Sequence, residues 1–464
     1  MSETSTERGF NFRSFISLLE KRGDLIRIQQ HIDPKFELPA VLWKLQEQGK
    51  GAVFENVHGS PFSVAGGLFP RMERLGLALG ITPTREFITM QDTGYLDAAL
   101  ARPLPYRSVE TGPVQKVLRI GSDIDVKKLP VPSFYEYDSG PFVTGGIGIV
   151  RHTDTGKLNA GIYRILVLGR DLITINAGAN SDLSRIYRAA QGRHEKLSIA
   201  VAIGVPPALL VAAASKTPRT ISEFDVAGAL RGKPLDMVQC RTCDLFVPAD
   251  AEIVIEGEVD FSQSVENILG EAGAQYRSRT NPVTQVTCIS HRQDAIFYAI
   301  HAGPSPEHLT LGAFSIIGLK AAFIAAVEQK FSAIKEAHLY TIGDGLHLAV
   351  TLKKKECDAA MRLIREFFAM PKGFHVIYPF IKRLIVVDAD IDIYTCSDIE
   401  WAVWNRVHDA ERIVLLPGMP EEPSAGERKS IRVGIDATGN PQDAAMLKKV
   451  RNPLLENIIL ENYL

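Results

Sequence analysis

The chain has 464 residues, more than one ordinary hydrophobic core holds, so its length predicts two or three domains. Its composition is 45% hydrophobic and 23% charged, which is typical of globular proteins and excludes a disordered or fibrous chain. The net charge of -2, from 52 basic and 54 acidic side chains, provides no global field to attract nucleic acid or an anionic membrane. We therefore expect a small-molecule partner.

Two further features predict the compartment. The first twelve residues are polar and charged, and no later run reaches the ~18 apolar residues that a membrane-spanning helix needs. The 5 cysteines are an odd number, thinly spread, and do not indicate a disulfide framework. We expect a soluble protein of the reducing cytoplasm, without a membrane span.

The first hundred residues alternate helical and strand patterns. Apolar residues at helical spacing predict a helix over residues 12–22, and short apolar runs predict strands at 25–28 and 51–56. This alternation predicts a small α/β domain over residues 1–113. It includes a proline-bearing stretch, 102–106, that we interpret as a linker.

The pattern changes over residues 114–311. Short runs rich in Val, Ile and Thr are separated by Gly, Pro and Asp, as at 145–151 and 283–289, which is typical of strands. We expect a mostly β domain here, followed by an apolar, alanine-rich linker helix within residues 312–332.

Residues 333–464 return to alternating patterns, which predict a third domain, of α/β type. Its expected strands are 348–352 and 384–387, and its expected helices are 357–368 and 399–407. The tail, 443–464, has helical spacing interrupted by Pro453, and we interpret it as a segment that docks on a partner subunit.

The common motifs of nucleotide and hydrolase chemistry are missing. The run Gly145-Gly-Ile-Gly148 lacks the third glycine of a dinucleotide fingerprint, and there is no Walker loop or Gly-x-Ser-x-Gly elbow. Cys240 and Cys243 have the spacing of a metal-ligand pair, but no second Cys or His pair follows nearby. We expect two ordinary reduced cysteines there rather than a zinc site.

A set of polar side chains lies within the β region instead: Asn159, Arg164, Glu223, Glu266 and Glu271. An arginine in an apolar strand usually needs a carboxylate partner. Taken singly, each of these residues would more often have a structural role. Together, an arginine that holds a carboxylate by its fork and two glutamates five residues apart suit acid/base chemistry.

Several rarer motifs occur together in one order. They are Asp138-Ser-Gly-Pro-Phe-Val-Thr-Gly-Gly146, Thr155-Gly-Lys-Leu-Asn-Ala-Gly-Ile-Tyr-Arg164, Thr287-Cys-Ile-Ser-His-Arg292, Gly303-Pro-Ser-Pro-Glu-His-Leu-Thr-Leu-Gly312, Lys382-Arg-Leu-Ile-Val-Val-Asp388 and Gly434-Ile-Asp-Ala-Thr438. By these motifs the chain resembles, over almost its whole length, the UbiD family of decarboxylases. That family includes ferulic acid decarboxylase and the 3-octaprenyl-4-hydroxybenzoate decarboxylase of the ubiquinone pathway.

The resemblance implies an α+β subunit in which a central split β-barrel binds prenylated FMN. The barrel would occupy residues 114–311, between α/β domains at 1–113 and 333–464, and the linker helix would lie at 312–332. It also implies a homodimer or homohexamer, and a flavin prenyltransferase as the partner that supplies the cofactor.

The resemblance assigns roles to single residues. In the catalytic set, Arg164 would orient the substrate carboxylate, Glu266 would hold Arg164, and Glu271 would deliver a proton. The matched cofactor-binding positions are Asn159, Ile162, Tyr163, Arg164, Glu223 and Lys382, the last of these near the cofactor phosphate. Asn159 and Glu223 would also bind a divalent metal, usually manganese, with potassium as an optional second cation.

The chain departs from the family pattern at the third metal ligand. Where the family usually has histidine, the run Ser181-Asp-Leu-Ser-Arg-Ile-Tyr187 places Asp182, whose carboxylate suits a hard divalent ion. Asn176 and Asn180 are the alternative oxygen donors.

A second departure lies beside the expected substrate. The family run Glu-Gly-Pro-Phe-Gly-Glu becomes Glu266-Asn-Ile-Leu-Gly-Glu271, and the following segment contains Arg277 and Arg279. If that segment is extended, both arginines point to one face. They are either solvated surface residues or groups that meet a second anionic part of the substrate.

The implied activity is the reversible, non-oxidative removal of CO2 from an aromatic, heteroaromatic or α,β-unsaturated acid, through a covalent adduct with prenylated FMN. The cofactor is needed because loss of CO2 from an sp2 carbon requires an electron sink that no side chain provides. We expect Glu271 to lie in a dry site that raises its pKa. The alternatives are carboxylation by the same cofactor, an altered member that acts on an aryl thioester or another bulky anion, and a cofactor-free assembly subunit.

Overall fold

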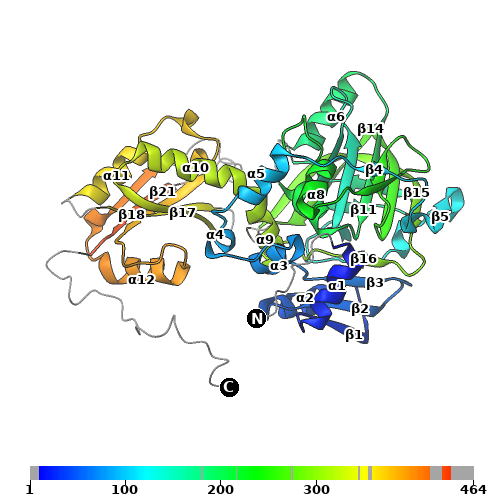
Figure 1. Cartoon of the computed structure of the whole chain (residues 1–464), viewed down its shortest axis with the longest axis horizontal. Helices are drawn as coiled ribbons and strands as arrows, with labels where there is room; N and C mark the ends of the chain where they lie inside the picture. Colours follow the sequence, from blue (N-terminus) through cyan, green and yellow to red (C-terminus); the bar gives the residue numbers. More distant parts are fainter. Residues whose placement is uncertain are drawn as a thin grey trace. The chain divides into compact units, whose positions relative to one another are not determined.

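The computed structural model describes residues 10–178, 181–215, 217–271, 273, 275–342, 345–353, 358–417 and 431–439. The chain forms two compact units of mixed α+β structure, Met1–Gly318 and Leu319–Leu464 (Figure 1). Among the described residues no single helix is long and apolar enough to cross a membrane. One bent pair, Pro306–Ser315 with Ile317–Lys330, reaches that length and composition only when the two helices are taken together.

The first unit begins with a small sheet whose strand order is β1-β2-β3-β16. As the sequence predicted, helix α1 is followed by strands in this region, and α1 buries Phe12, Phe15, Ile16 and Leu19 on one face. The elements are α1 (Phe12–Lys21), β1 (Leu25–Ile32), α2 (Glu37–Glu47), β2 (Gly51–Val57), β3 (Ser63–Gly66), α3 (Met72–Leu79), α4 (Arg85–Ile88), α5 (Gly94–Ala101) and, from much later in the chain, β16 (Ile296–Tyr298).

A nine-stranded sheet forms the centre of the first unit, with the order β6-β9-β10-β15-β14-β11-β7-β8 and β5 paired to β15. Its long hairpin, β14–β15, is antiparallel. The strands are β5 (Val117–Ile120), β6 (Phe142–Val143), β7 (Gly146–Arg151), β8 (Leu158–Ile162), β9 (Ile165–Val167), β10 (Leu172–Ile175), β11 (Leu197–Ile203), β14 (Ile253–Gly270) and β15 (Tyr276–His291).

The connection from β8 to β9 requires this sheet to curl. In the strand order, β8 and β9 are six strand spacings apart, which is about 29 Å in a flat sheet. Only Tyr163 and Arg164 separate these strands along the chain, and that link spans at most ~11 Å. The sheet is therefore a curled half-barrel, and Tyr163 and Arg164 cross the seam where its two ends approach each other.

Helices interrupt the region that was expected to be mostly β. They are α6 (Asp182–Gly192), α7 (Pro207–Ala214) and α8 (Glu223–Arg231), followed after the sheet by α9 (Pro306–Ser315). Glu223, which we expected within β structure, is therefore the first residue of a helix. A third, small sheet has the order β13-β12-β4, with β4 (Arg107–Ser108), β12 (Asp236–Gln239) and β13 (Phe246–Pro248).

The second unit is a five-stranded sheet of order β17-β18-β19-β21-β20 with helices on both faces (Figure 1). Leu348 and Val350 pack with α10 and α11, whereas Ala349 packs with α12 on the opposite face. The elements are α10 (Ile317–Lys330), β17 (Ile334–Ile342), β18 (Gly345–Leu352), α11 (Ala359–Phe368), β19 (Ile381–Val387), α12 (Cys396–Arg406), β20 (Ile413–Pro417) and β21 (Ile431–Ala437). The predicted strands and helices of this region are confirmed to within a few residues, and the predicted tail helix lies outside the described residues.

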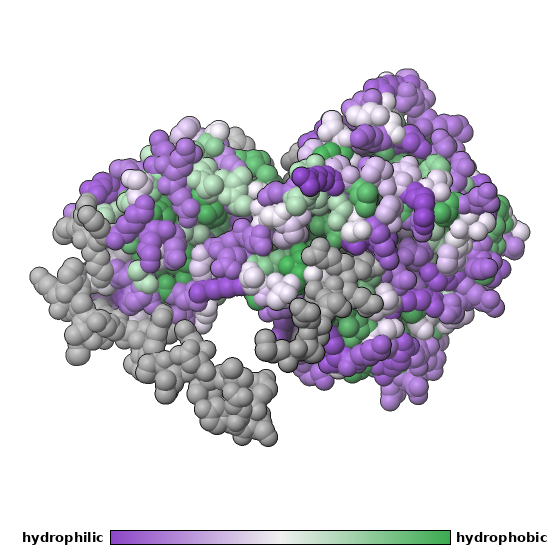
Figure 2. All heavy atoms as spheres, in the orientation of Figure 1, coloured by the Kyte–Doolittle hydropathy of each residue, from purple (hydrophilic) through white to green (hydrophobic). Residues whose placement is uncertain are grey.

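The visible face of each unit is mostly hydrophilic, with apolar residues scattered between the polar ones (Figure 2). This surface is ordinary for a globular chain, because polar residues are too few to cover a fold completely.

Candidate active site at the seam of the curled sheet

Two facing glycines make room for the residue that begins the seam. Gly148 of β7 is paired with Gly161 of β8. A Cβ atom would come within 2.8 Å of the Tyr163 side chain at Gly148 and within 2.6 Å at Gly161. The glycine-rich run after Thr144 thus provides space for an aromatic ring rather than for a dinucleotide. The half-buried ring of Tyr163 packs over these two glycines, directly before Arg164 in the chain.

Arg164 crosses the seam to the tip of the β14–β15 hairpin. Its Nη2 atom lies 2.6 Å from Glu271 Oε2, and its Nη1 donates a hydrogen bond of 2.8 Å to the carbonyl oxygen of Gly270. The Arg279 Nη2 atom approaches the other carboxylate oxygen, Oε1, at 3.3 Å. Arg164 and Glu271 have side chains only 17% and 13% exposed, so the expected carboxylate partner of this arginine is Glu271.

The charges around Glu271 control its pKa. Burial alone would raise that pKa, but the charges and hydrogen bonds of Arg164 and Arg279 outweigh burial and hold it below the usual range. The expectation of a raised pKa is therefore wrong for this arrangement, because two arginines occupy the dry site together with the carboxylate.

Glu266 lies apart from this pair. Within β14 the side chains alternate, so that Asn267 and Leu269 are buried whereas Glu266 and Ile268 face solvent. Glu266 accepts a hydrogen bond from the Ser278 hydroxyl on the neighbouring strand. The contact that we expected between Glu266 and Arg164 is thus replaced by the Arg164–Glu271 pair, because strand alternation directs Glu266 outward. The catalytic role of Glu266 stays a prediction.

A cavity of about 320 Å³ opens beside the Arg164–Glu271 pair. Two buried polar atoms on its wall, Thr144 Oγ1 and Asn176 Nδ2, have no hydrogen-bond partner within the described part of the chain. The lining residues are Thr144, Ile162, Tyr163, Arg164, Asn176, Gly178, Ser181, Ala213, Ala214, Arg279, Ile300, Ala302, His308, Leu311, Gly312 and Ser315. Three of the predicted cofactor-binding residues, Ile162 to Arg164, therefore share one wall.

His308 on this wall was not singled out from the sequence. Its Nδ1 lies 2.7 Å from the carbonyl oxygen of Gly303, so Nδ1 donates and Nε2 of the neutral ring is left as an acceptor. Burial, and after it the charge of Arg164, lowers the pKa of His308 and keeps the ring neutral. The sequence feature that could have indicated His308 is its place three residues after Ser305, whose side chain caps the start of α9.

Two of the predicted metal ligands, Asn159 and Glu223, are in contact with each other. The buried Glu223 carboxylate accepts hydrogen bonds from Asn159 Nδ2 at 3.3 Å and from the Ala160 N–H at 2.9 Å. Burial, helped by the charge of Asp182, raises the pKa of Glu223 to about 7. The Asn159 Oδ1 atom is buried and has no partner among the described residues. An unpaired amide oxygen beside a carboxylate is a suitable donor set for a hard divalent cation.

Asp182 is the first residue of α6. Its Oδ1 atom lies 3.1 Å from Arg185 Nη1 and 3.4 Å from Arg219 Nε, so the carboxylate is shared between two arginines. Its charge acts on Glu223, but a direct place in a metal shell stays a prediction. Of the two alternatives, Asn176 lines the cavity, and Asn180 lies outside the described residues.

The remaining predicted residues are divided between the two units. Arg277 and Arg279 are both half-buried on β15, whereas the residues between and beside them are exposed, which agrees with one shared face. Only Arg279 is among the residues that line the cavity. Lys382 lies on β19 of the second unit, so its expected place near the cofactor phosphate stays a prediction.

Comparison with known proteins identifies the family. Residues 107–305 match the 3-octaprenyl-4-hydroxybenzoate carboxy-lyase Rift-related domain, and residues 16–92 and 315–437 match the N-terminal and C-terminal domains of the same carboxy-lyase.

Solved structures agree with this match. The UbiD-class enzyme HmfF from Pelotomaculum thermopropionicum, in complex with FMN, is 31% identical, with 98% of this chain and 100% of that chain covered and a TM-score of 0.80. An evolved dimeric form of HmfF in complex with prFMN is also 31% identical, with 98% of this chain and 100% of that chain covered and a TM-score of 0.78. The vanillic acid decarboxylase of Sedimentibacter hydroxybenzoicus in its closed form is 25% identical, with 96% and 97% covered and a TM-score of 0.71. The resemblance predicted from the motifs is confirmed: this chain belongs to the UbiD family of carboxy-lyases, whose members are decarboxylases.

Proposed function

We propose that this chain removes CO2 from an aromatic, heteroaromatic or α,β-unsaturated carboxylic acid that binds in the seam cavity beside Arg164. The observation that supports this most is the half-buried pair of Glu271 with Arg164, the arginine that lines the cavity. It offers a fork for a carboxylate and, next to that fork, a carboxyl group that can take up and deliver a proton once Arg164 releases it.

Prenylated FMN is the proposed cofactor, and the curled sheet is its proposed split-barrel binding domain. The partnerless Thr144 Oγ1 and Asn176 Nδ2 atoms suit a ligand with many hydrogen-bonding groups, such as a flavin. Both HmfF structures contain FMN or prFMN. Bound there, the cofactor would supply the electron sink that CO2 loss from an sp2 carbon requires.

Arg164 orients the substrate in this proposal. An incoming carboxylate competes with Glu271 for the two donor nitrogens of Arg164, because both anions present the same pair of oxygens. Arg164 then points the scissile C–CO2 bond away from solvent, and the apolar wall around Ile162 and Leu311 excludes water from the reacting carbon.

Glu271 becomes a proton carrier by losing its partner. Its pKa is lowered only because Arg164 and Arg279 offset its burial. When Arg164 turns to the substrate, burial dominates, and the carboxylate takes up a proton on the oxygen that the arginine released. That proton replaces CO2 on the substrate carbon. The titratable groups around Glu271 in this step are Arg164, Arg279, His308 and Asp138.

A divalent metal, which we expect to be manganese, would be held by Asn159 Oδ1 and the Glu223 carboxylate, with Asp182 as the third ligand. The partnerless Asn159 oxygen and the two nearby carboxylates support this set. We also propose Lys382 as a contact of the cofactor phosphate and a homo-oligomeric assembly.

The test is decarboxylation by protein co-produced with a flavin prenyltransferase. Aryl, heteroaryl and acrylic acids should be screened for CO2 release, with Glu271→Gln as the matched variant because it keeps the shape of the side chain. We expect at least one acid to be turned over by the native chain and not by the variant. Failure of every acid with flavin and metal bound would contradict the proposal.

A further inference from the structure

A second buried cluster lies in the first unit, on the side of the sheet where β12 turns into β13. Cys240 directly follows β12, and its N–H donates a hydrogen bond of 2.8 Å to the carbonyl oxygen of Leu245 across the turn. Cys243 lies within the same turn and is half-buried. The two thiols therefore stand on one tight turn between antiparallel strands, and both are free.

Two more groups face this turn from the long hairpin. Glu256 of β14 is paired directly with Cys288 of β15, so their side chains lie on the same face of the sheet. Glu256 is 1% exposed, and Cys288 is fully buried.

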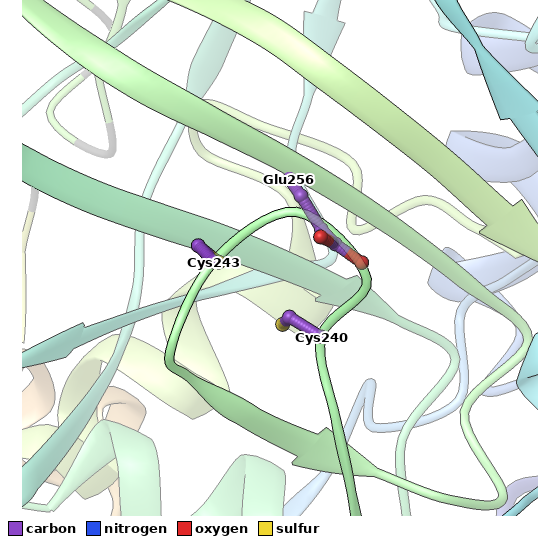
Figure 3. Close-up of side chains that lie close together, drawn as sticks. All are labelled: Cys240, Cys243 and Glu256. Carbon is purple, nitrogen blue, oxygen red and sulfur yellow. The ribbon is translucent and has the colours of Figure 1, made fainter.

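Three of these side chains, those of Cys240, Cys243 and Glu256, converge on one point. The sulfur atoms of Cys240 and Cys243 and a carboxylate oxygen of Glu256 all lie within 4.8 Å of one another (Figure 3). A small closure brings such atoms to the corners of a tetrahedron around a metal ion, whose bonds to sulfur and oxygen are roughly 2.0–2.3 Å long.

Glu256 is a buried carboxylate that is held by neutral hydrogen-bond donors. Its oxygens accept hydrogen bonds from the N–H groups of Arg241 (2.9 Å) and Thr242 (2.7 Å) and from the Thr242 hydroxyl (2.7 Å). All three donors are neutral, and within the described ranges Glu256 forms no ion pair. The equally buried Glu252, by contrast, is paired with Arg13 at 2.8 Å and Arg292 at 3.5 Å.

Neutral donors alone do not make a metal site. Glu307 is also fully buried and accepts from the N–H groups of residues 67–69 and from the Tyr298 hydroxyl. Among the described residues Glu307 belongs to no cluster with thiols, and its hydrogen bonds hold the loop at residues 67–69. Glu256 differs because it faces three thiols from two chain segments, Cys240 and Cys243 on the turn and Cys288 across the hairpin.

We propose that Cys240, Cys243, Cys288 and Glu256 form a binding site for Zn²⁺. The ligands come as two pairs, one from the turn and one from opposite strands, and together they provide sulfur and oxygen donors for a closed tetrahedral site. Binding releases the thiol protons to solvent and neutralises the buried carboxylate charge. The ion ties the β12–β13 turn to the base of the hairpin whose tip carries Glu271. The site is separate from the oxygen-rich ligands proposed for manganese.

Cobalt(II) provides the test, because its spectrum reports the donor atoms. Reduced, metal-free protein of full length should be titrated with Co²⁺ and then with Zn²⁺. We expect one equivalent of Co²⁺ to give a thiolate-to-metal charge-transfer band and the visible bands of a tetrahedral ion, and one equivalent of Zn²⁺ to remove both. Oxygen ligands at Asn159 and Glu223 cannot give the charge-transfer band, so the two sites are distinguishable.

Three variants sharpen the titration. Cys243→Ser and Cys288→Ser should each weaken the band and lower Zn²⁺ affinity by more than tenfold. Cys396→Ser, an exposed cysteine of the second unit, should leave both unchanged. The proposal is overturned by a missing charge-transfer band in native protein, by an unaltered band in Cys288→Ser, or by a Cys240–Cys243 disulfide that forms instead of the metal complex.

Discussion

The two ends of strand β14 carry buried carboxylates in opposite surroundings. Glu256, near the start of the strand, receives three neutral hydrogen bonds and no ion pair among the described residues. Glu271, just beyond its end, is held by Arg164 and Arg279 on the wall of a cavity. An incoming anion can replace a carboxylate that is paired with arginines. A carboxylate that is held by neutral donors keeps its negative charge available for a cation.

Glu223 belongs with Glu256 in this comparison. Its hydrogen bonds come from an amide side chain and a backbone N–H, both neutral, and the neighbouring Asn159 oxygen has no partner in the described chain. The donor atoms then select the ion: oxygen ligands around Glu223 suit manganese or magnesium, and thiols around Glu256 suit zinc.

Replacing Glu271 by Gln should have the largest effect on activity. The amide keeps the shape of the side chain but cannot carry the proton, so kcat should fall by about 10²–10⁴-fold. Flavin and metal content should stay unchanged, as measured by absorbance and elemental analysis. Glu266→Gln, five residues earlier on β14, is the matched control, and its loss should be much smaller because Glu266 faces solvent. An equal loss in both variants would mean that the hairpin tip rearranges when substrate binds.

Arg164 should rank second. Hydrogen bonds between charged groups are worth about 1.5–3 kcal/mol, so Arg164→Ala should lower kcat/KM by roughly 10- to 150-fold. Arg164→Lys should lose less than the alanine variant because it keeps the charge, but it lacks the planar fork. Steady-state kinetics on one acid would measure both, and an unchanged kcat/KM in either variant would remove Arg164 from substrate binding.

Variants of the proposed manganese site test whether a carboxylate held by neutral donors, such as Glu223, binds a cation. Asn159→Ala and Glu223→Gln should each lower bound Mn²⁺ by more than tenfold, measured by elemental analysis of purified protein. Asp182→Ala should lower it less, because Arg185 and Arg219 already share that carboxylate. Asp260→Ala serves as the control, because this β14 carboxylate accepts its hydrogen bonds from Ser262 and Gln263. Full retention of Mn²⁺ in Asp182→Ala would move the third ligand to Asn176 or Asn180.

The smallest effect concerns the space around Tyr163. In Gly161→Ala the new methyl group would lie 2.6 Å from the Tyr163 hydroxyl oxygen and 2.7 Å from the nearest ring atom, so we expect a loss of about 1–3 kcal/mol in unfolding free energy. Gly192→Ala at the end of α6 adds a methyl group with nothing within 4 Å, and it should be neutral or slightly stabilising. Denaturant unfolding monitored by fluorescence compares them. Equal stability would show that Tyr163 does not depend on the glycine pair.

Local patterns predicted much of the fold. The spacing of Phe12, Phe15, Ile16 and Leu19 predicted α1, and the apolar runs predicted β2, β18 and β19, because burial of one face imposes a periodicity on the sequence. Rare motifs, not periodicity, predicted the family and placed Arg164 and Glu271 in one site.

What the sequence did not predict depends on strand register. The outward direction of Glu266 follows from the alternation of β14, and the pairing of Glu256 with Cys288 depends on a register shift between Glu256 and Gly257. A lone Cys-x-x-Cys pair therefore looked unremarkable, because its two further neighbours come from strands 13 and 45 residues later. Strand alternation also explains why Arg164 pairs with Glu271 and not, as expected from the sequence, with Glu266.

The central claim is that a bound carboxylate displaces Glu271 from Arg164 and that Glu271 then takes up a proton. The most direct test is to count the protons that the protein takes up when such an anion binds. Calorimetric titration of the holoenzyme with benzoate, which serves as a non-reacting carboxylate, in buffers of different ionisation enthalpy measures protons taken up. Because the pKa of Glu271 is lowered in the free protein and should rise when Arg164 leaves it, we predict proton uptake and an affinity that falls as pH rises. His308→Gln should keep this uptake and Glu271→Gln should abolish it. No uptake by the native protein, or the same uptake in Glu271→Gln, would contradict the account.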